Sequence, residues 1–489
     1  MLFNSADFLI FFPAVLSVYF LLPKKIRQYW LLAASYYFYM CWNPKYILLI
    51  LFSTIVTFIS GLLLEWVKDK RRKLVVAGSF ILNLGILCCF KYINFVFALM
   101  EKAVSCINMS LNTPRFDMIL PVGISFYTFQ ALSYTVDVYR GEIYAEKNFF
   151  RYALFVSFFP QLVAGPIERS KNLLKQLAEP KPFEFERARE GFLLMLWGYF
   201  LKLVLADRIA VFVDTVYGDI TTYPGYYLIV ATMLFAIQIY CDFAGYSVIA
   251  MGTAKVLGIN LMENFDAPYL AASVADFWRR WHISLTSWFR DYLYIPLGGS
   301  REGKVRKYAN KMLVFLLSGL WHGASVSFVI WGCLNGIYQV MGEVLQPARD
   351  RVVKIFQLNR QSIGHKLLQV VGTFALVDFS WIFFRAGSTR TAIDIIKNIL
   401  STRNPWILFD GSLYTCGLDS KEFGIMVVCI LVLLAVDLCK YRHITVRDVI
   451  IKQDYWFRWF FIAFSIVFIL VFGVWGTEYD ASGFIYFQF

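Results

Sequence analysis

Long apolar runs alternate with short, basic loops along the whole chain. A transmembrane helix needs roughly 20 apolar residues, and ten runs approach or exceed that length: 6–22, 29–42, 46–64, 74–100, 118–136, 191–213, 225–241, 367–384, 423–439 and 457–476. This pattern predicts an all-α polytopic membrane protein. Residues 1–489 are expected to form a single integral membrane domain, in which 457–489 hold the last transmembrane helix and an aromatic C-terminal tail.

The basic loops predict how the chain is oriented. Lysines and arginines gather after the first and third runs, at 24–27 and 68–73. Because cytoplasmic loops carry an excess of these residues, both loops are expected inside and the N-terminus outside. The later basic loops (169–189, 279–311, 349–360 and 440–458) agree with this count. The C-terminus is then also expected on the extracytoplasmic side.

The stretch 312–342 is uncharged, yet basic segments flank it on both sides. Both of its ends should therefore be cytoplasmic, although two full crossings would take roughly 40 residues. A re-entrant hairpin satisfies both conditions, with Ser318, Gly319, His322 and Gly323 at its tip. One long tilted helix is the alternative, and it would break the charge rule. Irregular backbone at membrane depth must line a protein-enclosed or wet cavity, so the hairpin predicts a tunnel around His322.

Composition supports the membrane assignment. The chain is 59% hydrophobic and 17% charged, whereas a soluble domain is about 45–50% apolar and about 25% charged. The net charge of +13 falls in short loops between apolar runs, which is the orientation signal of a membrane protein rather than a nucleic-acid surface. The nine cysteines are scattered without metal-ligand spacing, so neither a metal site nor a disulfide framework is expected.

Two of the four histidines lie in unusual surroundings. An ionisable group at membrane depth is costly, which makes His322 a functional candidate, and imidazole transfers protons near neutral pH. His282 lies within an arginine-rich and aromatic segment, 276–295. A structural interfacial helix would account for most of that segment, but not for His282. His365 and His443 lie at predicted span ends and are expected to be ordinary interfacial residues.

Charged residues also interrupt several apolar runs: Lys202, Asp207, Arg208, Asp242 and Asp378. Pairing within the helix bundle is the simplest expectation for them. Asp242 is the best exception, because it lies where small residues close a predicted span. We therefore group it with Ser318 and Trp321 as candidates for lining the tunnel.

Two further sets of residues are candidates for binding and transfer. Arg279, Arg280 and Arg290, with Trp278, could hold a phosphate-bearing donor at the cytosolic face. The C-terminal tail is aromatic, and Tyr486 carries the only hydroxyl group of its last seven residues, 483–489. Burial in a groove or tunnel is expected for such a tail, with a hydrophobic plug as the alternative.

Several segments resemble the membrane-bound O-acyltransferase (MBOAT) family, in particular its bacterial branch of alginate and peptidoglycan O-acetylation and teichoic acid D-alanylation subunits. The resemblance runs through 121–130, 159–167, 240–247, 280–284, 291–299 and 320–324. It implies about 10–12 transmembrane helices, with re-entrant and interfacial helices, around a central tunnel. It also implies that His322 is the catalytic histidine and that His282 is the second characteristic histidine.

The resemblance also implies a reaction. Acetyl-CoA would be the cytosolic donor substrate, with no bound cofactor, and an extracytoplasmic polysaccharide the acceptor, at the bacterial inner membrane. An extracytoplasmic or membrane-anchored partner of the serine-hydrolase type would collect the acetyl group. Tyr486 matches a tyrosine proposed to carry the acyl group in the D-alanylation system, and is therefore a candidate relay. Transfer of D-alanine from a carrier protein, and a non-enzymatic transporter or scramblase, are the alternatives.

Overall fold

The computed structural model describes residues 1–116, 120–163 and 165–474 of the chain. Tyr486 and most of the predicted tail lie outside the described residues. Within the described ranges the regular elements are all helices, with no strand. The predicted all-α class is therefore confirmed.

The chain divides into two compact units. The first contains residues 1–195 and 249–262, and the second contains residues 196–248 and 263–489. Helix α12 (Tyr226–Val256) belongs to both units, because its last residues form part of the first.

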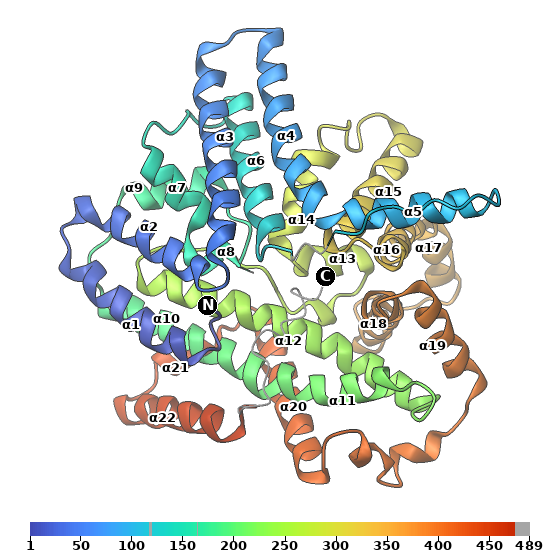
Figure 1. Ribbon diagram of the computed structural model, residues 1–489. Helices are drawn as coiled ribbons and strands as arrows, with labels where there is room; N and C mark the ends of the chain where they lie inside the picture. The colour runs from blue at the N-terminus through green and yellow to red at the C-terminus, as the bar shows by residue number, and fades with distance from the viewer. Residues whose placement is uncertain (117–119, 164, 475–489) are drawn as a thin grey trace. The chain divides into compact units, whose positions relative to one another are not determined.

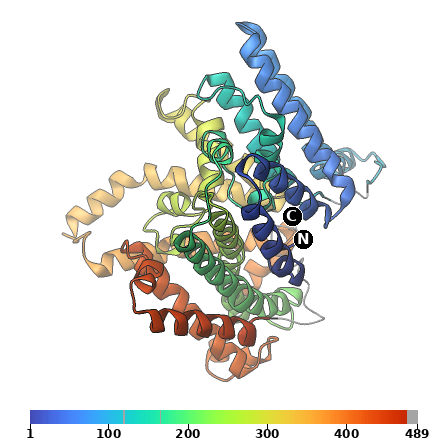
Figure 2. The ribbon, with the colours of Figure 1, turned by 90° about the vertical axis from the view of Figure 1, so that its left-hand side faces the viewer.

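The first unit is built from ten helices among the described residues. They are α1 (Ala6–Leu21), α2 (Lys24–Met40), α3 (Ile47–Trp66), α4 (Lys70–Lys91), α5 (Ile93–Ser105), α6 (Ile124–Arg140), α7 (Phe149–Ser157), α8 (Phe159–Leu162), α9 (Ser170–Ala178) and most of α10 (Phe185–Tyr199). Helices α3, α4 and α6 pack side by side (Figure 1). Helices α1 and α2 are neighbours, as the dark blue ribbons in Figures 1 and 2 show.

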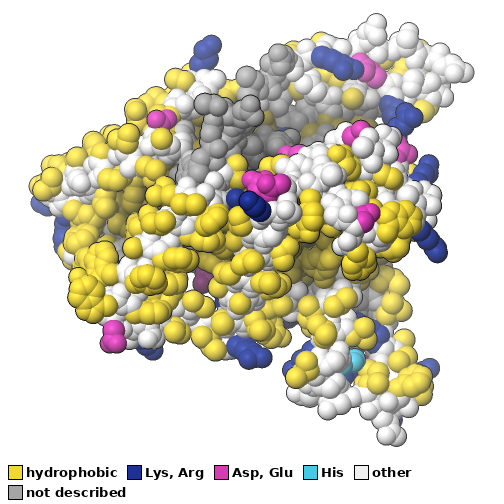
Figure 3. Space-filling view, turned by 90° about the horizontal axis from the view of Figure 1, so that it is seen from below, with side chains coloured by type: hydrophobic (Ala, Val, Ile, Leu, Met, Phe, Trp, Pro, Cys, Tyr) yellow, Lys and Arg dark blue, Asp and Glu magenta, His cyan; other side chains and the backbone are white. Residues whose placement is uncertain are grey.

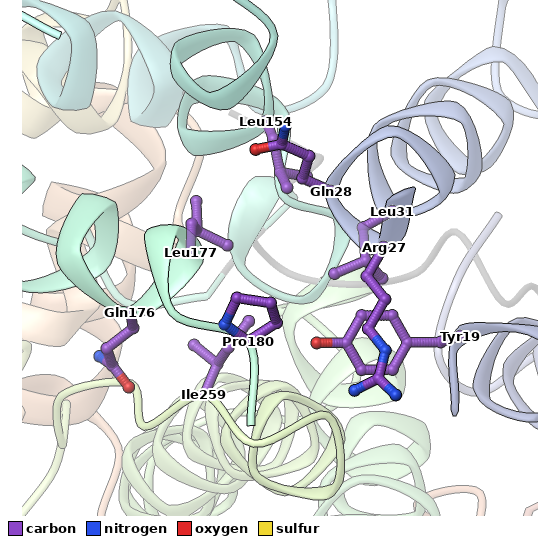
Figure 4. Close-up of a pocket in the computed structure, with 9 residues that line it drawn as sticks. All are labelled: Tyr19, Arg27, Gln28, Leu31, Leu154, Gln176, Leu177, Pro180 and Ile259. Carbon is purple, nitrogen blue, oxygen red and sulfur yellow. The ribbon is translucent and has the colours of Figure 1, made fainter. Parts of the chain in front are cut away.

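A small cavity in the first unit is lined in part by Arg27 and Tyr19 (Figure 4). The Arg27 guanidinium donates to the carbonyl oxygens of Phe20, Leu22 and Lys181 at 2.9–3.2 Å. It also lies 5.0 Å from the centre of the Tyr19 ring. The cavity measures about 10 Å³, which is room for about one water molecule. Arg27 therefore has a structural role here, and the cavity is too small for a substrate.

In the second unit, a π-helical turn (Phe200–Ala206) leads into α11 (Asp207–Gly218). The later helices are α13 (Val274–Arg280), α14 (Ile283–Phe289), α15 (Gly303–His322), α16 (Val326–Val344), α17 (Gln346–Ile355), α18 (Ile363–Arg385), α19 (Thr389–Ser401), α20 (Ser420–Tyr441), α21 (Val446–Ile451) and α22 (Tyr455–Phe472). Helices α13 and α14 and the link between them carry the arginine-rich and aromatic segment identified in the sequence.

Helices α15 and α16 form an antiparallel hairpin. Gly319 in α15 faces Phe328 in α16, and Gly332 in α16 faces Phe315 in α15. A Cβ atom on Gly319 would lie 2.3 Å from the carbonyl oxygen of Phe328, so the close approach of the two backbones requires glycine there. The chain reverses between His322 and Val326, so this stretch forms a hairpin and not a single long helix. That the hairpin is re-entrant in a membrane stays a prediction. Helix α15 begins well before the uncharged stretch.

Fewer helices are long and apolar enough to cross a membrane than the ten runs and the resemblance suggested. Among the described residues there are six, or seven if the bent pair α16 and α17 counts as one span. The difference has two causes. Helices α1, α2 and α6 have only 16 or 17 residues. The 191–213 run is interrupted by the π-helical turn and carries charged residues. The run 74–100 is divided too, because α4 ends at Lys91 and α5 begins at Ile93, but α4 by itself is one of the six.

The surface of the spanning helices is mostly apolar. Trp456, Phe460 and Leu470 on α22 are 82%, 71% and 61% exposed. Hydrophobic side chains likewise cover much of the face seen in Figure 3, with lysines and arginines mainly near its edges. Exposed apolar surface on this scale is typical of contact with lipid.

Candidate functional site

His322 lies at the tip of the α15–α16 hairpin. It is the last residue of α15, and Gly323 continues in an extended conformation. A Cβ atom on Gly323 would lie 2.2 Å from the ring of Phe328, so only glycine fits directly after the histidine. His322 is 4% exposed. Local packing therefore fixes the point at which the helix ends and buries the imidazole there.

Aromatic rings surround the imidazole of His322. Its ring centre lies 5.0 Å from that of Trp321, 5.1 Å from that of Trp331 and 5.4 Å from that of Phe384. These residues come from α15, α16 and α18 respectively. Trp381 stacks on Trp331 at 5.8 Å and extends the aromatic cluster. Apolar rings exclude water, so electrostatic and proton-transfer interactions are stronger here than in solvent.

His282 lies between α13 and α14 in a left-handed backbone conformation, with φ +45° and ψ 53°. Holding a residue other than glycine in such a backbone conformation costs about 1–3 kcal/mol. Residues with strained backbone conformations cluster at functional sites. The side chain is completely buried. The Phe243 ring packs edge-to-face against the imidazole, with centres 4.7 Å apart.

Asn264 is the main polar neighbour of His282. Its Oδ1 atom lies 3.1 Å from Nδ1 of His282. The same oxygen accepts hydrogen bonds from the backbone N–H of Ser284 at 3.2 Å and from the Ser284 hydroxyl at 2.9 Å. Burial lowers the pKa of His282 to about 3. The ring is therefore neutral at physiological pH.

The two imidazoles lie next to each other, although 40 positions separate them in the sequence. Their ring centres are 6.4 Å apart, and the Trp321 ring contacts both. Hydrogen bonds to a ring nitrogen span about 2.7–3.2 Å, so one reacting oxygen could reach both rings. The structure thus joins the two histidines that the sequence analysis selected separately.

The residues predicted to bind the donor fall into different environments. Arg280 donates to the side chains of Asp266 and Asp276 at 3.3 and 3.2 Å, and its guanidinium lies 5.1 Å from the centre of the Tyr441 ring. Arg279 and Arg290 are exposed. Arg279 and Arg290 are therefore better placed to bind a soluble anion, whereas Arg280 stabilises the segment that carries His282. Donor binding by all three remains a prediction.

Trp278 points into the second unit rather than toward solvent. It is 5% exposed, and its Nε1 donates to Oδ1 of Asn335 at 3.2 Å. Asn335 in turn donates to the carbonyl oxygen of Trp331 at 2.9 Å. Trp278 therefore supports the aromatic cluster, and its predicted contact with a donor would require a ligand that reaches this interior.

The predicted tunnel residues are all buried. Ser318 and Trp321 are 5% and 4% exposed in the last turn of α15. Asp242 lies 2.6 Å from Nζ of Lys202, and Asp207 lies 2.8 Å from the same atom. The expected pairing is confirmed for Lys202 and Asp207, and Asp242, which the sequence analysis singled out as the exception, is paired as well. The tunnel itself remains a prediction.

Arg208 and Asp378, the other two charged residues within apolar runs, do not take part in this ion-paired cluster. Arg208 donates to the carbonyl oxygen of Phe472 at 2.8 Å and to that of Val204 at 3.3 Å. Asp378 makes no ion pair with any residue that the structure describes. The expected pairing with another charge is therefore wrong for Asp378. Its carboxylate lies on α18, close enough to Tyr217 and Tyr269 to interact with them electrostatically.

Sequence reasoning missed the residues that support the two histidines: Asn264, Asn335, Phe243, Trp331 and Trp381. Their positions become meaningful only when the loop before α13 and helices α12, α16 and α18 are brought together. Asn264 stands in an ordinary polar stretch, where an asparagine is most often a turn residue. The aromatic residues lie in apolar runs and resemble any other core or lipid-facing position.

The chain is similar to known membrane acyltransferases. Residues 146–377 match the MBOAT, membrane-bound O-acyltransferase family. The chain is 34% identical to the probable alginate O-acetylase AlgI of Pseudomonas aeruginosa, over 88% of this chain and 81% of that protein. It is 31% identical to the peptidoglycan O-acetyltransferase of Helicobacter pylori, over 82% and 80%.

A more distant relative is the teichoic acid D-alanyltransferase of Bacillus subtilis, which is 27% identical over 55% of this chain and 70% of that protein. The matched region 146–377 contains both histidines with Trp321 and Trp331, and Trp381 and Phe384 follow just after it. The chain therefore belongs to the membrane-bound O-acyltransferase family and is a multi-pass membrane O-acyltransferase.

Proposed function

We propose that the protein transfers an acetyl group from cytosolic acetyl-CoA to a polysaccharide of the cell envelope, with His322 as the general base. The observation that carries this proposal is the pair of buried imidazoles, 6.4 Å apart, at a hairpin tip enclosed by aromatic rings. The names of the relatives, alginate O-acetylase and peptidoglycan O-acetyltransferase, support an envelope polymer as the acceptor.

The transfer step needs a base because a hydroxyl group is a weak nucleophile near neutral pH. His322 would remove the proton from the acceptor hydroxyl as its oxygen attacks the thioester carbonyl carbon. The carbon–sulfur bond then breaks, and the thiolate of coenzyme A leaves and takes up the proton from the imidazolium. His282, which is neutral in its buried position, would contact the same reacting oxygen. Base catalysis of this type contributes about 10²–10⁴-fold to a rate.

The two sides of the membrane have separate tasks in this proposal. Coenzyme A is large and anionic, so only the acetyl group should cross, while Arg279 and Arg290 hold the donor phosphates at the cytosolic mouth. The orientation proposed from the basic loops places both termini outside a bacterial inner membrane. An extracytoplasmic partner enzyme of the serine-hydrolase type would receive the acetyl group and pass it to sugar hydroxyls.

Tyr486 is the proposed relay between these stages. A phenol has a pKa of about 10 and needs a base beside it to attack a thioester. The resulting phenyl ester keeps much of the transfer potential of the thioester. A D-alanyl donor is the second candidate, because the B. subtilis relative is named a D-alanyltransferase. Acetyl transfer is favoured, since the acetyltransferase relatives are more similar to this chain and cover more of it.

The direct test uses membranes that contain the protein and acetyl-CoA labelled in its acetyl group. His322→Ala should lower coenzyme A release and label transfer at least 100-fold. His365→Ala is the matched control and should act like wild type, because His365 lies at the start of α18 outside the aromatic cluster. Equal activity of both variants would contradict the assignment of His322. Transfer only from a D-alanyl carrier protein would contradict the acetyl donor.

The relay has its own test. Tyr486→Phe should abolish acetylation of the acceptor while the protein stays folded in the membrane. Phe487→Leu is the control, because it changes the neighbouring aromatic residue without touching a hydroxyl group. Normal activity of Tyr486→Phe would remove the relay and leave the role of His322 untouched.

A further inference from the structure

We propose that Asn264 is a positioning residue that fixes the tautomer of His282, so that Nδ1 carries the proton and Nε2 the lone pair. His282 then takes part in transfer as a proton or hydrogen-bond acceptor through Nε2. This inference rests on the proposed function in one respect, the participation of His282 in transfer. The hydrogen-bond geometry around Asn264 carries the rest.

The orientation of the Asn264 amide is set by its neighbours. The backbone N–H of Ser284 can only donate, and it lies 3.2 Å from Oδ1, so the atom on that side must be the oxygen. The nitrogen on the other side, Nδ2, donates to the hydroxyl of Ser247 at 3.1 Å. The Ser284 hydroxyl also reaches Oδ1, at 2.9 Å. The backbone N–H decides which end of the amide faces His282, and the two hydroxyl groups, which can donate or accept, are compatible with it.

The tautomer follows from this orientation. An amide oxygen has no proton to give, so the contact of 3.1 Å with Nδ1 of His282 requires that Nδ1 donates. In a neutral imidazole, one ring nitrogen is a donor and the other is an acceptor. Complete burial keeps the ring neutral. Nε2 is therefore the basic nitrogen of His282.

Asn264 also holds the backbone that carries the ring. Its carbonyl oxygen accepts a hydrogen bond from the N–H of Ile283 at 3.0 Å, and the N–H of Asp266 donates to the carbonyl oxygen of Arg280 at 2.9 Å. These two bonds tie the loop before α13 to both sides of His282. They explain how a histidine persists at a φ of +45°. The edge-to-face contact with Phe243 then limits rotation of the ring.

The first measurement reads the tautomer directly. The protein is labelled with ¹⁵N at its four histidines, reconstituted in lipid bilayers and studied by nitrogen NMR, with the His282 signals identified by their loss in His282→Gln. Wild type should show Nδ1–H and an unprotonated Nε2. A protonated Nε2 in the wild-type protein would overturn the inference. This result requires neither a donor substrate nor a tolerated Asn264 variant, so it stands even if the proposed reaction is wrong.

The second measurement tests whether the side chain at position 264 acts on the His282 ring. Asn264→Asp keeps the acceptor oxygen but adds a negative charge about 3 Å from Nδ1, which raises the pKa of His282 by one unit or more. His322, 6.4 Å away, is the titratable neighbour that contacts the His282 ring. The pH at which the His282 ring takes up a proton, followed by nitrogen NMR, should therefore move upward by at least one pH unit.

Two other variants complete the series. Asn264→Ala should lower the transfer rate at least tenfold and lose the single-tautomer NMR signal. Ser247→Ala removes only the support of the far end of the amide and should keep the rate within about twofold. An unshifted nitrogen-NMR titration of His282 in Asn264→Asp, with Asn264→Ala as active as Ser247→Ala, would contradict a positioning role. Loss of all activity with the tautomer unchanged would show that Asn264 does not act through His282.

Discussion

The second unit contains two buried polar clusters that differ in kind. In one, Lys202 pairs with Asp207 and Asp242 at 2.8 and 2.6 Å, beside a π-helical turn. In the other, His282 and His322 lie among aromatic rings. The first cluster balances formal charges against one another. The second holds two imidazole rings, the side chain that most often acts as acid or base in catalysis.

This difference separates structural from chemical use of buried polar groups. The ion-paired cluster joins residues of α11, α12 and the π-helical turn, and its charges stabilise one another. The histidine cluster contains strained and tightly packed backbone. His282 adopts a left-handed conformation, and the chain at Gly323 has no room for a side chain. Burial of charge alone is therefore a poor guide to the site in this chain, whereas strain and tight packing around a titratable ring are better guides.

The largest expected effect would come from breaking the ion-paired cluster. Lys202→Met leaves two buried carboxylates without their cation, and removing one partner of a buried pair costs about 3–5 kcal/mol. Thermal unfolding in detergent should show a large drop in Tm. Lys397→Met, at an exposed position on α19, is the control and should change Tm little.

Adding Asp207→Asn and Asp242→Asn to Lys202→Met should restore part of that stability, because no unpaired charge then remains. If Lys202→Met instead keeps its Tm and loses acetyl transfer, the cluster belongs to the chemistry and the comparison fails.

The next effect concerns the hairpin that carries His322. Gly319→Ala would place a Cβ atom 2.3 Å from the Phe328 carbonyl oxygen, so α15 and α16 must move apart at a cost of about 1–3 kcal/mol. Gly342→Ala, near the other end of α16, meets open space and should stabilise the helix by about 0.5–1 kcal/mol. The stabilities of the two variants should therefore change in opposite directions, and only Gly319→Ala should lower the transfer rate. A rate for Gly319→Ala equal to that of Gly342→Ala would show that the hairpin spacing is irrelevant.

A smaller effect should appear in the pH dependence of stability. The pKa of His282 is lowered to about 3 by burial in the folded protein, against about 6.5 in an unfolded chain. Its contribution to stability is therefore complete above pH 6.5 and is lost as the pH falls, at about 1.4 kcal/mol per pH unit. His282→Gln should flatten the decline of Tm between pH 7 and pH 5. An equal decline in both proteins would mean that other groups control it.

The smallest effect is expected at the surface arginines. Arg279→Gln and Arg290→Gln should each raise the KM for acetyl-CoA a few-fold, with little change in Tm or kcat, because exposed charges interact weakly through water. The effect should shrink as salt is added. A fall in kcat without a change in KM would move these arginines from donor binding to the transfer step.

Much of the fold could be predicted from the sequence because lipid imposes a simple rule. Backbone polar groups must be satisfied internally, so apolar runs of sufficient length become helices. The runs 46–64, 367–384 and 423–439 fall inside helices of nearly the same extent, and most of the run 457–476 lies in α22, which ends at Phe472. The helix that contains 225–241 extends to Val256. Amphipathic or interrupted runs such as 191–213 were harder to interpret, because protein contacts replace lipid there.

The site could be predicted only in part. His322 and His282 stand out in the sequence because titratable rings are rare in apolar surroundings. Their proximity does not, since it depends on how the α15–α16 hairpin packs beside the α13–α14 link. Asn264 and Trp331 could not have been selected, because their roles are defined by contacts with residues distant in sequence. Arg280 was grouped with its neighbours by charge, yet Asp266 and Asp276 engage it.

A double-mutant cycle on the transfer rate tests the central claim, that the two imidazoles act as one centre, most directly. Initial rates are measured for wild type, His282→Gln, His322→Ala and the combined variant, with saturating labelled acetyl-CoA. Residues that act as a unit give strongly non-additive losses, so the combined variant should be about as active as His322→Ala alone. If the two losses multiply instead, the histidines act independently and the account of a shared centre is wrong.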